Sequence, residues 1–408
     1  MNIMTKYVVF KNQPEFRQAS LQDLLYCDDD TDFDDGLKQR DLTGTRTFNV
    51  YDTWRYRKSV NIYKIIEELE RFNKNTEHLR EVDRHSLYYT FYIPKKTRGY
   101  RKIDAPNADL MLALRYLKSI FEEKCVGYKS IGGFTTQLFA LYHTAAFAYI
   151  KRRGTVDCLR KHQKNDSNWY AKFDLSNFFG STTLEYTMQM FSRIFPFSEI
   201  CKYTTGRNEL EKALELAFLD GGLPQGTPIS PLITNIIMIP VDFELYNGFR
   251  NFKCTDRNGE EREQRCVYTR YADDFIVSSR LDFKFKEAQE YINSVLAKFN
   301  APFKLNEEKT RYGSRSGSNW NLGLMIGQDN KISLGHARKK RLKAMISNYV
   351  MDKKSGVRWP LEVIQEMDGL RSYYYMIDSE GADGMMAYLS NRFNVNIMEE
   401  IKNDLRAA

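Results

Sequence analysis

The chain has 408 residues, of which 42% are hydrophobic and 28% charged, a composition typical of a globular protein that excludes a disordered one. Its formal net charge of +8 suits a polyanionic partner, although many proteins without one are equally basic. No apolar run approaches the roughly 18 residues of a membrane-spanning helix, and no apolar signal region follows the N-terminus. Six cysteines without a Cys-x-x-Cys pair favour reduced thiols over disulfides or a zinc site, so we expect a cytoplasmic protein without a membrane partner.

The first 75 residues form an N-terminal extension with few signals. An acidic run at residues 27–35 has no glycine at a loop centre and no closing glutamate, so it predicts a solvated loop instead of a cation site. A helix is predicted over Ser59–Asn73, because hydrophobic residues recur there at helical spacing, namely Ile62, Ile65, Ile66 and Leu69.

A hairpin is predicted next. Tyr88–Ile93 is aromatic-rich and has the character of a strand, residues 94–99 form a basic turn, and Tyr100–Ile103 supplies a second strand. Asn107 can cap the helix that follows, whose apolar face carries Leu110, Leu114, Leu117 and Phe121.

The rest of the chain mixes strands with helices and then becomes helical. Strand and turn signals lie around Tyr170–Leu175 and Val267–Val277, and Pro231–Leu245 predicts one buried helix between them. From Gly335 onward the pattern is mostly helical and opens with the basic segment Arg338–Lys343. This order indicates an α+β protein.

The most specific chemical signal is Tyr271-Ala272-Asp273-Asp274, which lies between two strand-like segments. Two adjacent carboxylates at a tight turn repel one another, and a divalent cation would relieve that repulsion. The plain alternative is an ordinary Asp-Asp hairpin turn, and such a tetrapeptide arises by chance in roughly a few per cent of chains of this length. Taken alone, the turn does not decide between these interpretations.

A third acid, Asp174, ends another apolar strand. A single Asp there is more often a helix cap or a turn residue, but the later acid pair changes that interpretation. Carboxylates from separate elements can hold two Mg²⁺ about 4 Å apart, one activating a 3′-hydroxyl and one bracing the leaving pyrophosphate. Between the acids, the Pro/Gly-rich segment Gly222–Pro231 opens an apolar helix and can approach a flat ligand such as a base pair.

In this order, the motifs resemble those of the reverse transcriptase family, in particular the bacterial enzymes of the group II intron and retron lineage. The resemblance covers about residues 85–345. Two further segments agree with it: Leu305–Thr310 resembles the segment that carries a lysine near the triphosphate, and Asn321–Gly323 resembles the turn that grips the primer. The hairpin Ile93–Pro106 is similar to the basic hairpin that folds over the incoming nucleotide.

The resemblance implies a right-hand polymerase fold with fingers at 76–165, a palm at 166–330 and a helical thumb at 331–408. The implied reaction copies an RNA template into a DNA product from dNTPs. Two Mg²⁺ ions are the implied cofactors. Their implied ligands are Asp174, Asp273 and Asp274, with the Leu175 carbonyl as an additional ligand.

Further roles follow from the resemblance. Lys309 would donate a proton to pyrophosphate, and Leu322 and Gly323 would grip the primer. Phe179 occupies the steric-gate position, where its ring would clash with a ribose 2′-hydroxyl; a core aromatic is the plain alternative. The other implied nucleotide-binding residues are Lys95 and Arg101, which would neutralise the triphosphate, and Gln225 and Gly226, which would contact the templating base pair.

The segment Arg338–Lys343 is expected to begin a thumb helix along the duplex. Arg338 and Arg341 would share a helix face, but Met345 is the next residue on that face, so the basic stripe is short. Phosphate contacts from such a helix would not distinguish one nucleic-acid sequence from another. A solvated basic turn of helix is an equally good interpretation.

Several kinds of reverse transcriptase remain open. Asn321–Ile326 lacks the Val-Thr-Gly of retron enzymes, whereas the intact Leu223–Gly226 excludes the diversity-generating type, so a stand-alone enzyme of antiphage defence with a structured noncoding RNA template is expected. A retron-type enzyme is one alternative. A template-independent or protein-primed polymerase of abortive-infection type is a second, with Tyr373–Tyr375 as a source of hydroxyl primers. A non-catalytic RNA-binding scaffold is a third, but it would have no use for three converging acids.

Overall fold

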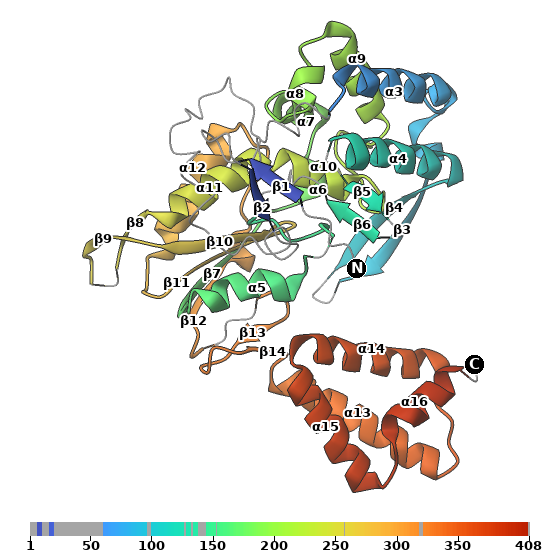
Figure 1. The fold of residues 1–408 in the computed structure, drawn as a ribbon, viewed down its shortest axis with the longest axis vertical. Helices are drawn as coiled ribbons and strands as arrows, with labels where there is room; N and C mark the ends of the chain where they lie inside the picture. Colours follow the sequence, from blue (N-terminus) through green and yellow to red (C-terminus); the bar gives the residue numbers. More distant parts are fainter. Residues whose placement is uncertain are drawn as a thin grey trace. The chain divides into compact units, whose positions relative to one another are not determined.

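The computed structural model describes residues 6–9, 16–19, 60–95, 99–125, 128–131, 134–137, 144–151, 153–256, 258–317 and 321–406 (Figure 1). The acidic run at 27–35 and residues 96–98 of the basic turn lie outside the described residues. The chain divides into two compact units, each assembled from separated segments. Unit 1 comprises Met1–Tyr149, Leu175–Asn247 and Tyr291–Leu305, and unit 2 comprises Ile150–Asp174, Gly248–Glu290 and Asn306–Ala408.

Unit 1 is mainly helical. The helix α3 (Ile62–Asn75) begins three residues later than expected and packs against α9 (Thr204–Glu215), beside which it lies in Figure 1. Asn73 anchors this contact, because its amide donates to the side chain of Glu209 over 2.6 Å. Further helices of the unit include α4 (Ala108–Ile120), which a π-helical turn extends to Cys125, α6 (Phe178–Ser181), α7 (Leu184–Phe191) and α8 (Phe197–Ile200).

Three two-stranded hairpins also belong to unit 1. They are β1 (Lys6–Val9) with β2 (Phe16–Ala19), β3 (Tyr88–Pro94) with β4 (Tyr100–Pro106), and β5 (Tyr128–Ile131) with β6 (Phe134–Gln137). The predicted hairpin is thus confirmed, although its second strand runs three residues further than expected. Asn107 caps α4 as predicted, accepting a hydrogen bond of 3.0 Å from the Leu110 amide.

The single helix expected over Pro231–Leu245 is wrong. Two helices occupy this stretch, α10 (Ser230–Ile237) and α11 (Ile239–Arg250), with a break at Met238. Pro240 explains the break, because a proline has no N–H for the helix ladder and its ring excludes the carbonyl four residues earlier. Both helices are rich in buried side chains, as the apolar pattern predicted.

Unit 2 contains a four-stranded sheet in the order β10-β11-β7-β12. Its strands are β7 (Trp169–Asp174), β10 (Cys266–Tyr271), β11 (Asp274–Ser279) and β12 (Arg311–Ser314), and all neighbours are antiparallel. The helix α5 (Thr155–Lys164) packs against β10. The helix α12 (Phe285–Lys298) follows β11 in the chain, and the strands β13 (Met325–Ile326) and β14 (Ile332–Ser333) form a further hairpin.

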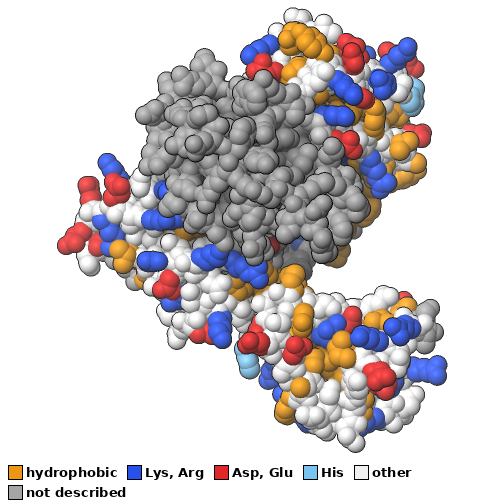
Figure 2. All heavy atoms as spheres, in the orientation of Figure 1, with side chains coloured by type: hydrophobic (Ala, Val, Ile, Leu, Met, Phe, Trp, Pro, Cys, Tyr) orange, Lys and Arg blue, Asp and Glu red, His pale blue; other side chains and the backbone are white. Residues whose placement is uncertain are grey.

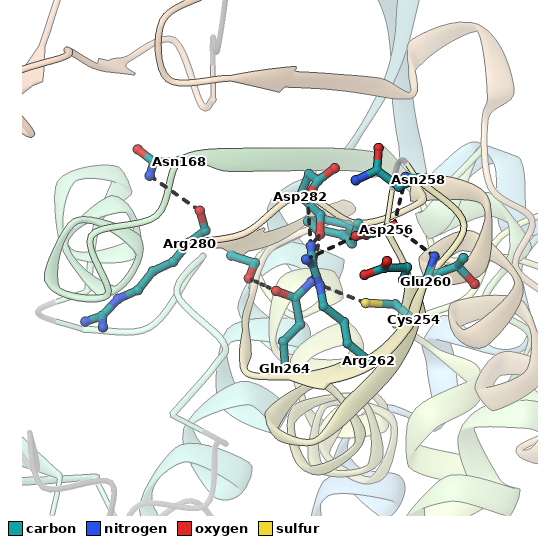
Figure 3. Close-up of polar contacts among 12 residues, drawn as sticks. Asn168, Cys254, Asp256, Asn258, Glu260, Arg262, Gln264, Arg280 and Asp282 are labelled. Carbon is teal, nitrogen blue, oxygen red and sulfur yellow. Dashed lines mark hydrogen bonds and ion pairs between the residues drawn. The ribbon is translucent and has the colours of Figure 1, made fainter.

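A polar network anchors the hairpin of β8 (Phe252–Thr255) and β9 (Glu261–Gln264), which leads directly into β10. Figure 3 shows Arg262 of this hairpin reaching Asp282, at 2.7 Å, and Asp256, at 3.6 Å. Gln264 donates to the Asp282 carbonyl and accepts from the Ser279 hydroxyl, each over 3.0 Å. These bonds hold the start of β10 against the end of β11.

The C-terminal part of unit 2 is helical, as predicted. It consists of α13 (His336–Lys354), α14 (Leu361–Ile377), α15 (Ser379–Phe393) and α16 (Ile397–Arg406), which pack as a bundle (Figure 1). On the face drawn in Figure 2, hydrophobic and basic side chains mix over this bundle. Within the bundle, Lys343 lies over the ring of the exposed Tyr388, 4.1 Å from its centroid. None of the helices in the described residues is long and apolar enough to cross a membrane.

Candidate active site

The strand register of unit 2 gathers the three predicted acids at one end of the sheet. Asp174, the last residue of β7, pairs directly with Asp274, the first residue of β11. Paired residues of neighbouring strands point to the same face of a sheet, so these two carboxylates share a face. Asp273 lies in the two-residue turn between β10 and β11, adjacent to Asp274. The structure therefore brings together the three acids that the sequence singled out.

The turn between β10 and β11 contains an unusual backbone conformation. Ala272, its first residue, has a φ of 57°, in the left-handed region that costs a residue with a side chain about 1–2 kcal/mol. The guanidinium of Arg270 donates to the Ala272 carbonyl over 3.2 Å, and this arginine is only 1% exposed. A buried, charge-assisted hydrogen bond thus helps to hold the turn that carries Asp273.

Two lysines contact the acids. The Nζ of Lys309 lies 2.7 Å from Oδ1 of Asp174, and this hydrogen bond is the main reason that the pKa of Lys309 is raised. The Nζ of Lys172 lies 2.9 Å from Oδ1 of Asp274. The backbone positions Lys309, because the Asn306 amide donates to the Asp174 carbonyl over 2.7 Å and a short helical turn over Glu307–Lys309 follows.

Burial makes the negative charge of this end unfavourable. Desolvation raises the pKa of Asp274 to about 6, and the neighbouring Asp273 and Asp174 add to the shift while Lys172 opposes it. Desolvation is also the main cause that raises the pKa of Asp273, with a further contribution from Asp174. Two of the three acids are therefore less stable as carboxylates than in water, and added positive charge would stabilise them.

The donor chemistry of the site fits Mg²⁺, which prefers carboxylate oxygens. Oδ1 of Asp274 is shielded from solvent, and the Nζ of Lys172 lies 2.9 Å from it. No three Asp, Glu, His or Cys side chains within the described residues, however, form a ready-made metal cluster. Lys309 and Lys172 supply the positive charge that lies beside Asp174 and Asp274 in this structure. Leu175, the additional predicted ligand, is buried and pairs with Leu305 in an isolated bridge.

A second group of predicted residues gathers in unit 1. The amide of Leu223 donates to the carbonyl of Phe179 over 3.0 Å, which ties the Pro/Gly-rich loop to α6. The Gln225 carbonyl accepts a bond of 2.8 Å from the Asp104 amide, which ties the same loop to β4. Gly226 has a φ of 120°, and a Cβ there would lie 2.9 Å from the Asp104 carbonyl oxygen, so this close approach requires glycine.

The side chains of this group are accessible to a ligand. Phe179 is half-buried, with its ring 6.5 Å from that of Tyr149 in an edge-on arrangement, so it is not enclosed in the core. Lys95 and Arg101 are exposed on the β3–β4 hairpin, where Lys95 closes the turn through its amide and Arg101 pairs with Ile93. No hydrogen bond or ion pair between these two side chains and Phe179 or Gln225 brings the four into one cluster among the described residues.

The predicted primer-grip residues form a tight turn. Leu322 and Gly323 both have positive φ, 54° and 78°, and the flanking Asn321 and Leu324 exchange backbone hydrogen bonds of 2.8 and 2.9 Å. This geometry is that of a two-residue β-turn with a glycine in its second position. The guanidinium of Arg338, from the start of α13, donates to the Gly323 carbonyl.

Two residues of the site, Lys172 and Arg270, were missed by the sequence analysis, and the contact that Arg338 makes was not expected. Lys172 lies two positions before Asp174 and therefore on the same face of β7. Because side chains of a strand alternate between its faces, this placement could have been predicted from the sequence. Arg270 gave no signal, because an arginine before a turn is usually exposed. Arg338 was assigned to duplex binding, whereas in this structure its guanidinium contacts Gly323; its neighbour on the helix face, Arg341, pairs with Glu366 at 3.3 Å.

Comparison with known proteins identifies the family. The family model described as reverse transcriptase (RNA-dependent DNA polymerase) matches residues 93–326, more than half of the chain. The chain belongs to the reverse transcriptase family. The predicted enzyme class, an RNA-directed DNA polymerase, and the predicted right-hand polymerase fold of the α+β class are thereby confirmed.

Individual relatives are retron enzymes. The Retron Ec83 reverse transcriptase of Escherichia coli is 26% identical over 297 residues, 71% of this chain and 83% of that protein. The Retron Ec73 reverse transcriptase of Escherichia coli is 29% identical over 212 residues, 50% of this chain and 62% of that protein. The Retron Mx65 reverse transcriptase of Myxococcus xanthus is 24% identical over 316 residues, 74% of this chain and 64% of that protein. The chain thus spans less than two thirds of the second and third, and it is similar to retron reverse transcriptases.

Among solved structures, telomerase from Candida albicans in complex with a TWJ fragment of telomeric RNA matches with 10% identity. The match covers 78% of this chain and 65% of that one, with a TM-score of 0.41. At such a score we draw nothing from the likeness.

Proposed function

We propose that this reverse transcriptase performs metal-dependent nucleotidyl transfer at Asp174, Asp273 and Asp274. The observation that carries the proposal is the register of β7 and β11, which places Asp174 opposite Asp274 beside the turn that holds Asp273. Two Mg²⁺ ions, when bound, would supply activation of the primer 3′-hydroxyl and neutralisation of the leaving pyrophosphate. The carboxylates of the three acids, with the Leu175 carbonyl, are the ligands we assign.

The lysines of the acid cluster take different roles in this proposal. Lys309, which is 60% exposed in its side chain, can leave Asp174 and donate its proton to the pyrophosphate oxygen as the product forms. Lys172 is less exposed, at 24%, and balances the charge of Asp274 before metal binds. Lys309 acts on the substrate, whereas Lys172 acts through Asp274.

The unit 1 residues would bind the nucleotide and the template. Phe179 would exclude a ribose 2′-hydroxyl, Gln225 and Gly226 would contact the templating base pair, and Lys95 and Arg101 would neutralise the triphosphate. The loop that carries Gln225 and Gly226 is tied to β4 through Asp104, which supports a nucleotide site formed jointly by the loop and the fingers hairpin. We assign Leu322 and Gly323 to the primer grip, and we retain fingers, palm and thumb at 76–165, 166–330 and 331–408.

Primer extension tests the activity. The purified protein should extend oligo(dT) on poly(rA) with dTTP, should require Mg²⁺, and should stop when EDTA is added. The dependence on template sequence is tested with poly(rC) and with each dNTP alone. Extension that needs the oligonucleotide but does not depend on the template sequence would contradict templated synthesis. Such a result would favour a template-independent polymerase, and transfer of label to the protein would identify a tyrosine primer.

The template is proposed to be a structured noncoding RNA, as in a retron-type system, working in antiphage defence in the cytoplasm. The similarity to three retron reverse transcriptases supports a retron-type system over a template-independent polymerase or a non-catalytic scaffold. Sequencing of the RNA and DNA that copurify with the protein should give one enriched RNA and DNA complementary to it. A profile that follows transcript abundance would contradict a dedicated template. Loss of phage protection in cells that carry an Asp174→Asn variant would test the defence role.

A further inference from the structure

A buried histidine beside the β10–β11 hairpin has no part in the chemistry proposed above. His162 lies in the last turn of α5 and is fully buried, and its burial lowers its pKa to about 3. A neutral imidazole carries one donor and one acceptor nitrogen, and both must find partners in the interior. Each ring nitrogen of His162 therefore needs a polar neighbour.

Both ring nitrogens have a partner, one on each strand of the hairpin. Nε2 lies 2.8 Å from the Thr269 hydroxyl of β10, and Nδ1 lies 2.6 Å from the Ser278 hydroxyl of β11. The chain of bonds continues on both sides. The Cys158 thiol of α5 donates to Thr269 over 3.2 Å, and the Ser278 hydroxyl donates to that of Ser167 over 2.8 Å.

The direction of these bonds assigns the tautomer. Ser278 gives its only hydroxyl proton to Ser167, so it must accept from His162, and Nδ1 carries the hydrogen. Nε2 then accepts from Thr269, which in turn accepts from the Cys158 thiol. The imidazole and the two hydroxyls that contact it each have a defined donor or acceptor role, and buried polar networks of this kind specify one arrangement of the groups they join.

The two hydroxyls lie on the sheet face that carries the acids. Thr269 pairs with Ile276, and Ser278 with Val267, so they are diagonal neighbours across β10 and β11. Thr269 is two residues from Tyr271, whose partner is Asp274, and alternate residues of a strand share a face. The imidazole therefore links the two strands at a fixed separation, on the face that ends in Asp274 and Asp174.

We propose that His162 is a positioning residue for the turn that carries Asp273, because its ring joins β10 to β11 and so fixes the hairpin whose second strand, β11, sets Asp274 opposite Asp174. A change of register by one residue would turn these side chains to the opposite face, and smaller shifts would misplace the carboxylates. The inference rests on the proposed function of the three acids. It assigns a role in that function to a residue that does not contact them directly.

Three variants separate positioning from simple stabilisation. His162→Phe keeps a ring of similar size but leaves the Thr269 and Ser278 hydroxyls without their ring partners. The triple variant His162→Phe/Thr269→Val/Ser278→Ala also removes those hydroxyls, so the buried polar groups disappear together with the link. Leu159→Ala is the matched control, because Leu159 is a fully buried residue of the same helix that takes no part in the network.

For each variant we would measure Tm, kcat and KM for dNTP in primer extension, and hydrogen exchange of peptides spanning residues 266–279 without metal. We expect His162→Phe to lower Tm and to reduce kcat at least about tenfold with KM within about twofold. The triple variant should recover Tm yet keep the low kcat and faster exchange around the turn. Leu159→Ala should lower Tm but leave kcat within about twofold below its melting range.

Recovery of kcat together with Tm in the triple variant would overturn the proposal, because the network would then serve stability alone. Unchanged exchange of the hairpin in both histidine variants would overturn it as well. These results differ from failure of the proposed function, which would appear as absence of templated extension by the wild-type protein. The exchange measurement needs no catalytic activity, and it tests the link even in that case.

Discussion

The acid end of the sheet in unit 2 and the β3–β4 hairpin in unit 1 are built in opposite ways. Around the acids, charged groups are packed close together: Asp174 is 6% exposed, a buried arginine holds the turn, and two lysines pair with two of the carboxylates. The hairpin instead has an open surface, with Tyr89 70% and Tyr92 64% exposed. Rigid elements carry the groups whose geometry decides the chemistry, and the exposed hairpin is free to contact a ligand.

This contrast divides the expected effects of mutation. Residues of the acid end should control kcat and the metal requirement, because they act at the reacting atoms. Residues of the loop and hairpin should control KM and selectivity, because they contact the substrate away from the reacting atoms. A variant of the acid end that changed only KM or selectivity, or a variant of the hairpin that changed only kcat, would contradict this comparison.

The largest effect is expected at Asp174. Asp174→Asn removes a carboxylate that metal ions require, and kcat should fall by about 10³-fold or more while folding is preserved. The matched control is Asp256→Asn, since Asp256 is also a buried acid of unit 2 but belongs to the β8–β9 network. Steady-state primer extension and circular dichroism are the measurements. A loss of equal size in the control would point to general disruption of unit 2.

The second effect concerns stability and pH. Because the pKa of Asp274 rises from an ordinary 3.8 to about 6 on folding, the folded state binds a proton more tightly than the unfolded chain. Below about pH 4, Asp274 is protonated in both the folded and the unfolded state, so its pKa shift costs no stability. As pH rises from about 4 to about 6 the metal-free protein loses up to about 3 kcal/mol of stability.

Asp274→Asn should therefore stabilise the metal-free protein at pH 7.5, and this gain should vanish near pH 4. Urea unfolding at several pH values in EDTA measures the difference. A variant equally or less stable than the wild type at pH 7.5 would show that the charge of Asp274 is already compensated in the folded protein.

The third effect concerns the nucleotide-binding residues proposed in unit 1. Phe179→Ala should raise the ratio of rNTP to dNTP incorporation at least about tenfold, because a smaller side chain no longer excludes the 2′-hydroxyl. Phe178→Ala is the neighbouring control, since the Phe178 ring packs against Phe303 in the core, with the ring centroids 4.9 Å apart. An unchanged ratio in Phe179→Ala would leave this residue with a packing role.

The smallest effect is expected at Lys172. Lys172→Met removes the cation that competes with metal for Asp274, so the Mg²⁺ concentration for half-maximal activity should fall several-fold. In EDTA the same variant should be less stable, because Asp274 loses its counter-ion. Lys102→Met, which breaks the ion pair of 3.2 Å with Asp104 in unit 1, is the control and should leave the Mg²⁺ dependence unchanged. A higher Mg²⁺ requirement in Lys172→Met would mean that Lys172 helps to assemble the metal site.

The sequence predicted three strands of the unit 2 sheet and the three acids because those features are local, whereas it gave no signal for β12 (Arg311–Ser314). Apolar, strand-like segments marked β7, β10 and β11, and the turn motif lay between two of them. The pairing of Asp174 with Asp274 depends on strand order, which local patterns do not contain. The resemblance to a family implied that the three acids act together, but it gave no strand order.

Other features were missed, two of them although the sequence carried a signal and two for physical reasons. The break between α10 and α11 was missed because the apolar pattern continues through Pro240, although the missing N–H of proline was a sufficient warning. Lys172 could have been found from the period of two along β7. Arg270 and His162 could not, because a buried arginine or histidine is recognisable only when the groups that receive its hydrogen bonds are in place.

The central claim is that Asp174, Asp273 and Asp274 form the metal-dependent polymerase site. The most direct test is primer extension by the Asp273→Asn/Asp274→Asn variant on an RNA template, with its RNA affinity measured in parallel. We predict that DNA synthesis is abolished at every Mg²⁺ concentration, because amides cannot supply the negative charge that two divalent cations require, and that RNA binding stays within about twofold of wild type. Retained templated synthesis by this variant would contradict the account.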